Sequence, residues 1–259
     1  MTASCHRPTN SKNLHRRNFD MIGIGTIANT GAVIAGGIIG ILFKKGLSQR
    51  FQDTIMQAIG LAVIFIGISG TLEKMLAIDG GSLTSGGTMM CAVSLALGAV
   101  IGEWMNIEKR FVKFGDWLRK KSGREKDSKF IDGFVMTTLT ICVGAMAVIG
   151  PIQDGLAGDP SMLYTKALLD GIIVAIFSAA FGVGAIFSAI PLFLFQGSIT
   201  LLARAIQIFL TTPMIDNMSM IGSMLIFCVG VNMIFPVKIK VANMLPSLIM
   251  VILYTTWLG

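Results

Sequence analysis

Long apolar runs recur along the whole chain, and they constrain its fold more than any other feature. Several runs of about twenty residues carry few or no charges, for example residues 22–43 and 216–235. Each is long enough to cross a hydrocarbon core of about 30 Å as an α-helix. The runs are continuous rather than alternating, which excludes a transmembrane β-barrel. We therefore expect an all-α integral membrane protein.

The composition supports a membrane protein without an enzymatic centre. Of the 259 residues, 53% are hydrophobic and 14% are charged, whereas soluble domains average about 25% charged residues. Both histidines, His6 and His15, precede the apolar region, which therefore lacks the residue that most often binds metals or relays protons. GISG at 67–70 matches an intramembrane serine protease motif, but Ser69 has no histidine base. We expect no enzyme activity, no metal and no cofactor.

Eight apolar segments predict eight transmembrane helices in one domain. They are expected at residues 22–43, 50–76, 87–105, 130–149, 163–189, 191–211, 216–235 and 241–258. Pro191 is expected to mark a tight turn before the sixth helix. A re-entrant pair within residues 144–165 would reduce the count to seven. Residues 1–20 are polar and basic, and we expect them to form a disordered extension, with Met21 as an alternative start.

Lysine and arginine gather in the loops after the first, third and seventh predicted helices, above all in residues 106–129. The loops on the other side hold only Lys74 and Lys166. By the positive-inside rule the basic loops are cytoplasmic and both termini lie outside. The basic N-terminal extension argues against this orientation, and translation from Met21 would remove the conflict. The net charge of +7 thus indicates orientation rather than nucleic-acid binding.

The basic loop itself contains a short amphipathic helix. Phe111, Phe114 and Trp117 follow helical spacing, while Lys120 and most other basic residues lie off that stripe. Such a helix is expected to lie on the membrane, with its aromatic side chains facing lipid and Trp117 near the headgroups. The expected partners are the bilayer and its anionic lipids.

Residues 144–171 interrupt the apolar pattern with prolines, glycines and carboxylates. Proline removes a backbone donor and disfavours helix at the preceding residue, so Gly150–Pro151 predicts a helix break. Gln153 and Asp154 follow the break at the outer surface, and Asp170 lies about one turn inside the next helix. Irregular backbone at membrane depth is tolerated only against protein or a water-lined cavity. This interruption is therefore the first candidate for a functional site.

Arg204 is expected to be the only basic residue inside a span, and an unpaired arginine there costs at least a few kcal/mol. Asp170 is its first expected partner, with Glu73 or Asp154 next. The alternatives are a purely structural ion pair, or an arginine that extends outward to the interface. Asn29 and Gln196 are neutral polar residues within predicted spans. They can form interhelical hydrogen bonds or line a hydrophilic pathway.

Two weaker patterns concern helix packing. A Gly36–Gly37–Gly40 ridge in the first helix suits close helix contact, and homo-oligomerisation through such ridges is one expectation. IGLAVIF at 59–65 and IGSMLIF at 221–227 share residues at equal spacing. Because these helices run in opposite directions, the match predicts a weak inverted repeat, as in many secondary transporters.

Several stretches resemble the YqgA/YdfK-like family of bacterial inner-membrane proteins, which contain a domain of unknown function. They include MIGIGTIANTGAVIAGGIIG from Met21, VGAMAVIGPIQDGLAGDPSMLYTKALLDG from Val143 and FSAIPLFLFQGSITLLA from Phe187. The resemblance extends from Met21 to the C-terminus. The family pattern has a proline where this chain has Ala145, so Pro151 is expected to supply the break. The resemblance implies a multi-pass protein of the bacterial plasma membrane, but it supplies no catalytic residues.

Two functions follow as hypotheses. The first is a transporter or channel for a small solute or ion, with a site between residues 150–171 and the first, second and sixth helices. The second is a scaffold or regulatory membrane protein that acts through the basic amphipathic helix. A water-accessible cavity near Asp170 would favour the first.

Overall fold

The computed structural model describes residues 22–44, 49–143, 146–208, 210–235 and 238–258. The predicted disordered extension 1–20 and Met21 lie outside the described residues. The helices are α1 (Ile24–Lys44), α2 (Gln49–Met75), α3 (Thr88–Met105), α4 (Ile107–Lys121), α5 (Phe130–Cys142), α6 (Met146–Ala157), α7 (Ser161–Phe181), α8 (Ala189–Leu201), α9 (Ala203–Gln207), α10 (Thr212–Ile234) and α11 (Ser247–Leu258). Two 3₁₀ segments, Val183–Ser188 and Val241–Met244, precede α8 and α11.

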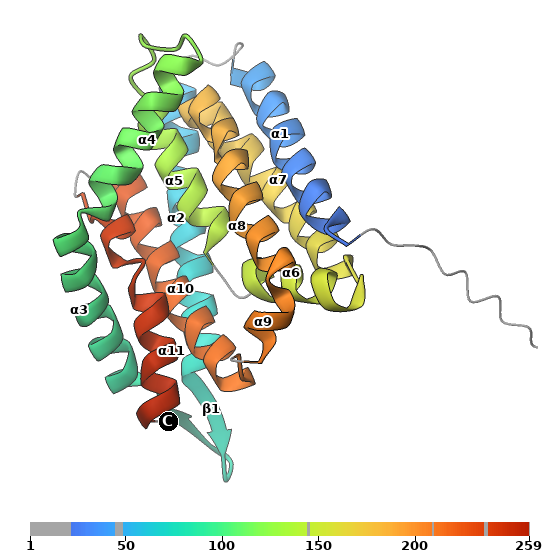
Figure 1. Ribbon diagram of the computed structural model, residues 1–259. Helices are drawn as coiled ribbons and strands as arrows, with labels where there is room; N and C mark the ends of the chain where they lie inside the picture. Colours follow the sequence, from blue (N-terminus) through green and yellow to red (C-terminus); the bar gives the residue numbers. More distant parts are fainter. Residues whose placement is uncertain (1–21, 45–48, 144–145, 209, 236–237, 259) are drawn as a thin grey trace, which may run out of the picture.

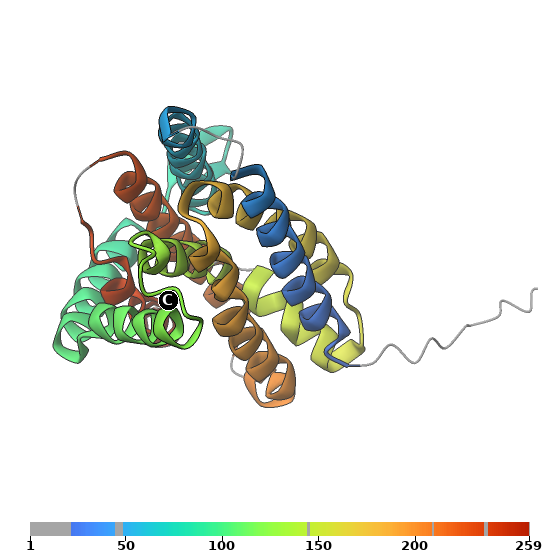
Figure 2. The same cartoon turned by 90° about the horizontal axis from the view of Figure 1, so that it is seen from above.

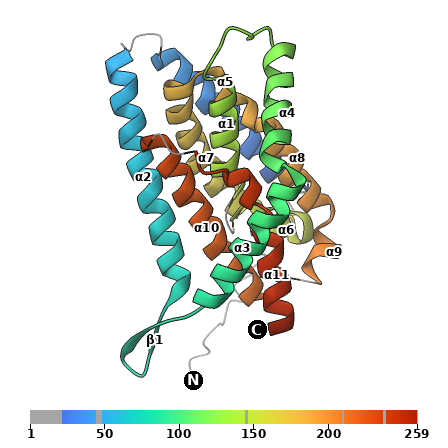
Figure 3. The ribbon, with the colours of Figure 1, turned by 90° about the vertical axis from the view of Figure 1, so that its left-hand side faces the viewer.

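The predicted class, an all-α membrane protein, is confirmed. Six helical segments of the described residues are long and apolar enough to cross a membrane. α5 and α6 meet that test only together, as a pair bent by 60° that is either a broken span or a re-entrant loop. The last predicted segment, 241–258, is a shorter apolar helix over Val241–Trp257. The α4–α5 connection and the start of α2 lie at one end of the bundle (Figures 1 and 3). We call this the α4–α5 end.

The spans of the two halves of the chain pack against each other through glycines. α1 lies beside α7 and runs parallel to it, as Figures 1 and 2 show. A Cβ at Gly36 would overlap the carbonyl oxygen of Gly171, and one at Gly40 would overlap that of Ala175. The predicted glycine ridge therefore makes a close helix contact, and it does so within one protomer. Its residues are consequently not free to form a contact between protomers.

α2 and α10 form the second large contact and run antiparallel (Figure 3). Gly67 packs against the backbone of Phe227, and Gly70 packs against Ser223. The two similar motifs, at 59–65 and 221–227, therefore lie on neighbouring helices. The inverted repeat itself stays a prediction.

The turn between the fifth and sixth spans lies at Gly182, so the prediction of a turn at Pro191 was wrong. Gly182 has φ 91° and ψ −152°, a backbone conformation that is essentially restricted to glycine. Pro191 instead occupies the first turn of α8, where the backbone N–H of an isolated helix has no acceptor and proline is tolerated.

A β-hairpin follows the second span. β1 (Leu76–Asp79) pairs antiparallel with β2 (Ser82–Ser85). Gly80 and Gly81 both have positive φ, 56° and 82°, which is the requirement of a tight primed hairpin turn. The hairpin projects from the end of the bundle opposite the α4–α5 end (Figures 1 and 3). We call this the hairpin end.

The amphipathic helix predicted in the basic loop is present as α4, but its aromatic stripe mostly faces protein. The rings of Phe111 and Phe114 lie 6.2 and 5.8 Å from the ring of Phe134 in α5. The prediction that both phenylalanines face lipid was therefore wrong, because α5 offered them a closer apolar surface. Trp117 remains 56% exposed. Lys120 forms a 3.0 Å ion pair with Asp116 one turn earlier.

Candidate functional site

The break in the fourth predicted span lies before Gly150–Pro151, so the predicted position was wrong. α5 ends at Cys142, Val143 is extended, and α6 runs from Met146 through Pro151 to Ala157. Residues 144–145 lie outside the described part of the chain. A proline removes one backbone hydrogen bond, and α6 continues through it. The chain therefore bends next to the C-terminal turn of α5, and this bend positions the site.

A lysine and an aspartate form a buried ion pair beside that bend. Lys166 Nζ lies 2.6 Å from Asp170 Oδ2 and 2.8 Å from Oδ1, and the two side chains are 7% and 4% exposed. Both residues belong to α7, where a spacing of four places them on one face. The prediction that Lys166 lies in a loop was wrong, and so was the prediction that Asp170 pairs with Arg204.

The start of α7 explains why Lys166 is buried. Asp159 Oδ1 accepts hydrogen bonds from the Ser161 backbone N–H (3.0 Å) and hydroxyl (2.6 Å). These bonds lower the pKa of Asp159, and they satisfy one of the unpaired backbone donors at the helix start. The helix therefore begins at Ser161, and Lys166 lies in its second turn.

The ammonium group of Lys166 has a further partner at the end of α5. It donates a 2.7 Å hydrogen bond to the carbonyl oxygen of Ile141, which belongs to the last turn of that helix. The last four carbonyls of a helix lack intrahelical partners, and the negative end of the helix dipole favours a cation there. The bend after α5 thus exposes a carbonyl group that a buried cation binds.

Two amide side chains extend this site to α1 and α8. Asn29 Nδ2 lies 3.0 Å from Asp170 Oδ2 and 3.1 Å from Gln196 Oε1. Both amides are fully buried, and Asn29 Oδ1 and Gln196 Nε2 have no hydrogen-bond partner among the described residues. Three predicted site residues, Asp170, Asn29 and Gln196, therefore lie together. We call them, with Lys166, the buried polar cluster.

Asp154 has a different environment from the predicted one. It is fully buried rather than at the surface, and its Oδ2 accepts a 3.2 Å hydrogen bond from the Gly25 backbone N–H at the start of α1. A carboxylate at a helix N-terminus satisfies free backbone donors and favours the helix dipole. Asp154 thus caps α1. Gln153 is half-buried beside it.

Arg204 and Glu73 lie outside the buried polar cluster. α8 ends at Leu201, so Arg204 falls in the short helix α9, where it is exposed and forms no salt bridge with the described residues. Glu73 pairs with Lys74 at 3.2 Å, and Lys74 also binds Asp216 at 2.9 Å. That ion-pair group joins the end of α2 to the start of α10.

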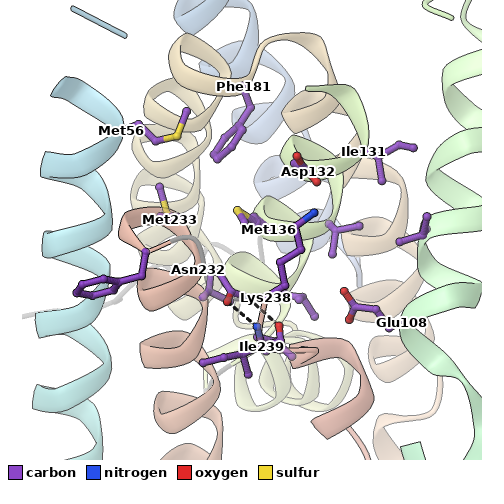
Figure 4. A pocket seen from close by; sticks show the side chains of 16 residues that line it. Met56, Glu108, Ile131, Asp132, Met136, Phe181, Asn232, Met233, Lys238 and Ile239 are labelled. Atoms are coloured by element: carbon purple, nitrogen blue, oxygen red, sulfur yellow. Dashed lines mark hydrogen bonds between the residues drawn. The ribbon is translucent and has the colours of Figure 1, made fainter. Parts of the chain in front are cut away.

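Two cavities have linings on either side of the last turn of α5. One, of about 430 Å³, includes Asp132 and Leu139 of α5 (Figure 4). We call it the α4–α5 cavity. The other, of about 380 Å³, is apolar and includes Cys142 and Val148. The Ile141 carbonyl that binds Lys166 lies in the turn between these linings.

Fold and site together define a polytopic helical membrane protein with a charged cluster buried among its spans. The chain belongs to the family described as "Protein of unknown function (DUF554)", whose model matches residues 24–256. It is 35% identical over 225 residues to "Uncharacterized membrane protein YdfK" of Bacillus subtilis (strain 168), covering 87% of this chain and 92% of the relative. It is 29% identical over 232 residues to "Uncharacterized protein YqgA" of Escherichia coli (strain K12), covering 88% and 94%. No solved structure matches the chain.

Proposed function

We propose that this protein is a transporter or channel for a small solute or ion, with the buried polar cluster at the centre of its pathway. The observation that supports this most directly is the Lys166–Asp170 pair, which is buried among membrane-spanning helices. Ionisable residues inside a membrane are costly and typically mark ion or substrate pathways. The proposal assigns no enzymatic step to the chain.

The broken span gives the pathway a form that known transporters use. Their substrate and ion sites are commonly built at discontinuous helices, whose free C-terminal carbonyls bind cations. Here the Ile141 carbonyl at the end of α5 binds the ammonium group of Lys166. Asn29 and Gln196 supply further unsatisfied polar atoms at the same point. The two cavities on either side of this turn are the proposed routes of access.

The proposed location is the bacterial plasma membrane, with residues 106–129 in the cytoplasm. The basic loops support this orientation by the positive-inside rule. We further propose that the exposed Trp117 and the lysines around it contact anionic lipids. The scaffold function loses support, because Phe111 and Phe114 pack on α5 and are not free for a partner.

The proposal is tested by measuring uptake of labelled solutes, together with charge movement, in proteoliposomes that contain the purified protein. A panel of amino acids, sugars, organic acids and inorganic ions is applied with and without proton or sodium gradients. At least one solute should give uptake or a current with the native protein. Asp170→Asn and Lys166→Met should each abolish that signal, because each removes one charge of the buried pair.

Arg204→Ala is the matched control, since Arg204 is exposed and makes no salt bridge with the described residues. It should leave that signal unchanged. Folding of each variant is checked by size-exclusion chromatography in detergent. A native protein that is silent across the whole panel, or well-folded pair variants with native signals, would refute the proposal.

A further inference from the structure

The α4–α5 cavity has the size of a small-molecule site. It is bounded by α4, α5, α10 and the segment that leads into α11, and its volume is about 430 Å³. Small-molecule sites commonly measure about 300–1,000 Å³ and combine an apolar lining with a few polar groups. The cavity is separate from the buried polar cluster, none of whose side chains line it.

Three charged side chains enter this cavity from three different elements. Glu108 comes from α4, Asp132 from α5 and Lys238 from the segment after α10 (Figure 4). Within the described part of the chain, neither Asp132 nor Lys238 forms an ion pair. Glu108 uses only its Oε2 atom, which accepts a 3.0 Å hydrogen bond from the Ala242 backbone. The cavity thus offers both signs of charge without an internal partner.

The remaining polar side chain of the lining is occupied. The amide of Asn232 exchanges two 2.8 Å hydrogen bonds with the backbone of Ile239 (Figure 4). It therefore fixes the segment that carries Lys238 and is not available to a ligand. Burial raises the pKa of Glu108, which is the direction expected for a carboxyl group in a partly apolar enclosure.

The rest of the lining is apolar. Val135 and Leu139 come from α5, Phe181 from the end of α7, and Val229 and Met233 from α10. Val135 and Leu139 follow Asp132 along α5 toward the turn that ends at Cys142, whereas Phe181 lies beside the start of α5. A ligand that fills the cavity therefore needs an apolar group against these side chains and charged groups that can reach Glu108, Asp132 and Lys238.

We infer that the α4–α5 cavity binds a small zwitterion with one ammonium group, one carboxylate and an apolar side chain, as the apolar amino acids have. The carboxylates of Glu108 and Asp132 face the ammonium group, and Lys238 faces the carboxylate. The role of the site as the substrate site of a transporter rests on the proposed function. Binding itself is independent of transport and can be measured on the solubilised protein.

The test uses the purified full-length protein in detergent and radiolabelled L-leucine, in a scintillation proximity assay. Three competitors each lack one feature of leucine: isoamylamine lacks the carboxylate, 4-methylpentanoate lacks the ammonium group, and glycine lacks the apolar side chain. Leucine should bind, and each competitor should bind about tenfold to a hundredfold more weakly, since each loses one charge-assisted or apolar contact.

Variants assign the charges. Lys238→Met should weaken leucine binding about tenfold and leave the affinity for isoamylamine, which has no carboxylate, unchanged. Asp132→Asn should weaken leucine and isoamylamine binding by a similar factor and leave 4-methylpentanoate unchanged. Lys126→Met, in the exposed connection between α4 and α5, is the control for loss of a positive charge and should bind as the native protein does.

Three results would overturn the inference. They are no leucine binding at millimolar concentration, isoamylamine binding as tight as leucine, or native affinity in both Lys238→Met and Asp132→Asn. Failure of the proposed function looks different. Leucine would then bind with the expected specificity, but no solute of the panel would be taken up by proteoliposomes or give a current. Conversely, a current that depends on Asp170 without leucine binding would refute only the inference.

Discussion

Removing one member of the Lys166–Asp170 pair should destabilise the protein much more than removing both. Lys166→Met would leave Asp170 buried, with only the Asn29 amide as a partner. Asp170→Leu would leave the Lys166 ammonium group with only the Ile141 carbonyl. An uncompensated buried charge costs about 3–5 kcal/mol. Each single variant should therefore melt roughly 6–20 °C below the native protein.

The double variant Lys166→Met/Asp170→Leu has no charge left at this site. The Ile141 carbonyl then loses its side-chain donor, while Asn29 Nδ2 keeps its hydrogen bond to Gln196. One unsatisfied carbonyl costs about 1–3 kcal/mol. Independent effects would instead add to about 6–10 kcal/mol. The double variant should therefore be more stable than either single variant.

Thermal melts in detergent and reversible unfolding in mixed micelles give the four stabilities of this cycle. Lys126→Met with Glu125→Gln is the control pair, because both residues are exposed in the α4–α5 connection. Such surface changes usually stay within about 0.5 kcal/mol. If the loss in the Lys166/Asp170 double variant equals the sum of the single losses, the two charges do not depend on each other, and the reasoning is refuted.

Three further predictions test packing, orientation and pH dependence. Gly36→Val should lower the free energy of unfolding by about 1–3 kcal/mol or more, because the new side chain meets an α7 carbonyl group. Gly31 has nothing within 4 Å of an added Cβ, so Gly31→Val should melt near the native temperature in the same thermal melts. In a cysteine-free background, a membrane-impermeant maleimide should label Thr84→Cys, which lies in the hairpin, when the cells are intact. It should label Lys126→Cys only after the cells are lysed. The reverse labelling pattern would show that the proposed orientation is inverted. Burial raises the pKa of Glu108 above its ordinary 4.5, so its contribution to stability is present below that pH and is lost as the pH rises through the raised pKa. Glu108→Gln should remove this part of the pH dependence, and melts that stay equally pH-dependent would contradict it.

The membrane class could be read from the sequence because the bilayer imposes it. A backbone in hydrocarbon must satisfy its own hydrogen bonds, so long apolar runs become helices. The same reasoning identified Asp170, Asn29 and Gln196, since polar side chains at membrane depth need polar partners. The structure brings these three residues together. What could be predicted was therefore which residues share a polar interior, rather than their exact contacts.

Lys166 was missed because its role depends on where α7 begins. The predicted helix from residue 163 places Lys166 in its first turn, where it was counted with the loop residues. The Asp159–Ser161 hydrogen bonds start α7 at Ser161, so Lys166 lies in the second turn. The signal was present as the four-residue spacing of Lys166 and Asp170. Arg204 was wrongly favoured because hydropathy alone did not reveal that α8 ends at Leu201.

Gly182 and the hairpin show a second limit of predicting this fold from the sequence, which concerns where the turns lie. Pro191 was expected to end a helix, but a proline in a first helical turn is compatible with the helix. Gly182, in the middle of an apolar run, makes the turn because its φ of 91° requires a glycine. In the hairpin, the Gly80–Gly81 pair was a readable turn signal. A glycine within an apolar run is therefore as strong a signal as a proline when the boundaries of membrane spans are predicted from the sequence.

The buried pair also bears on why such a chain would carry charges in its interior. Replacing a buried ion pair by apolar side chains of similar volume is often neutral or stabilising, so stability alone gives little reason for Lys166 and Asp170. A transport pathway gives a stronger reason for the two charges. A site at membrane depth must bind the permeating solute or ion in place of its own ion-pair partner. The double variant separates these explanations: if it folds stably but moves no solute, the pair serves transport, and if native currents persist, it serves only packing.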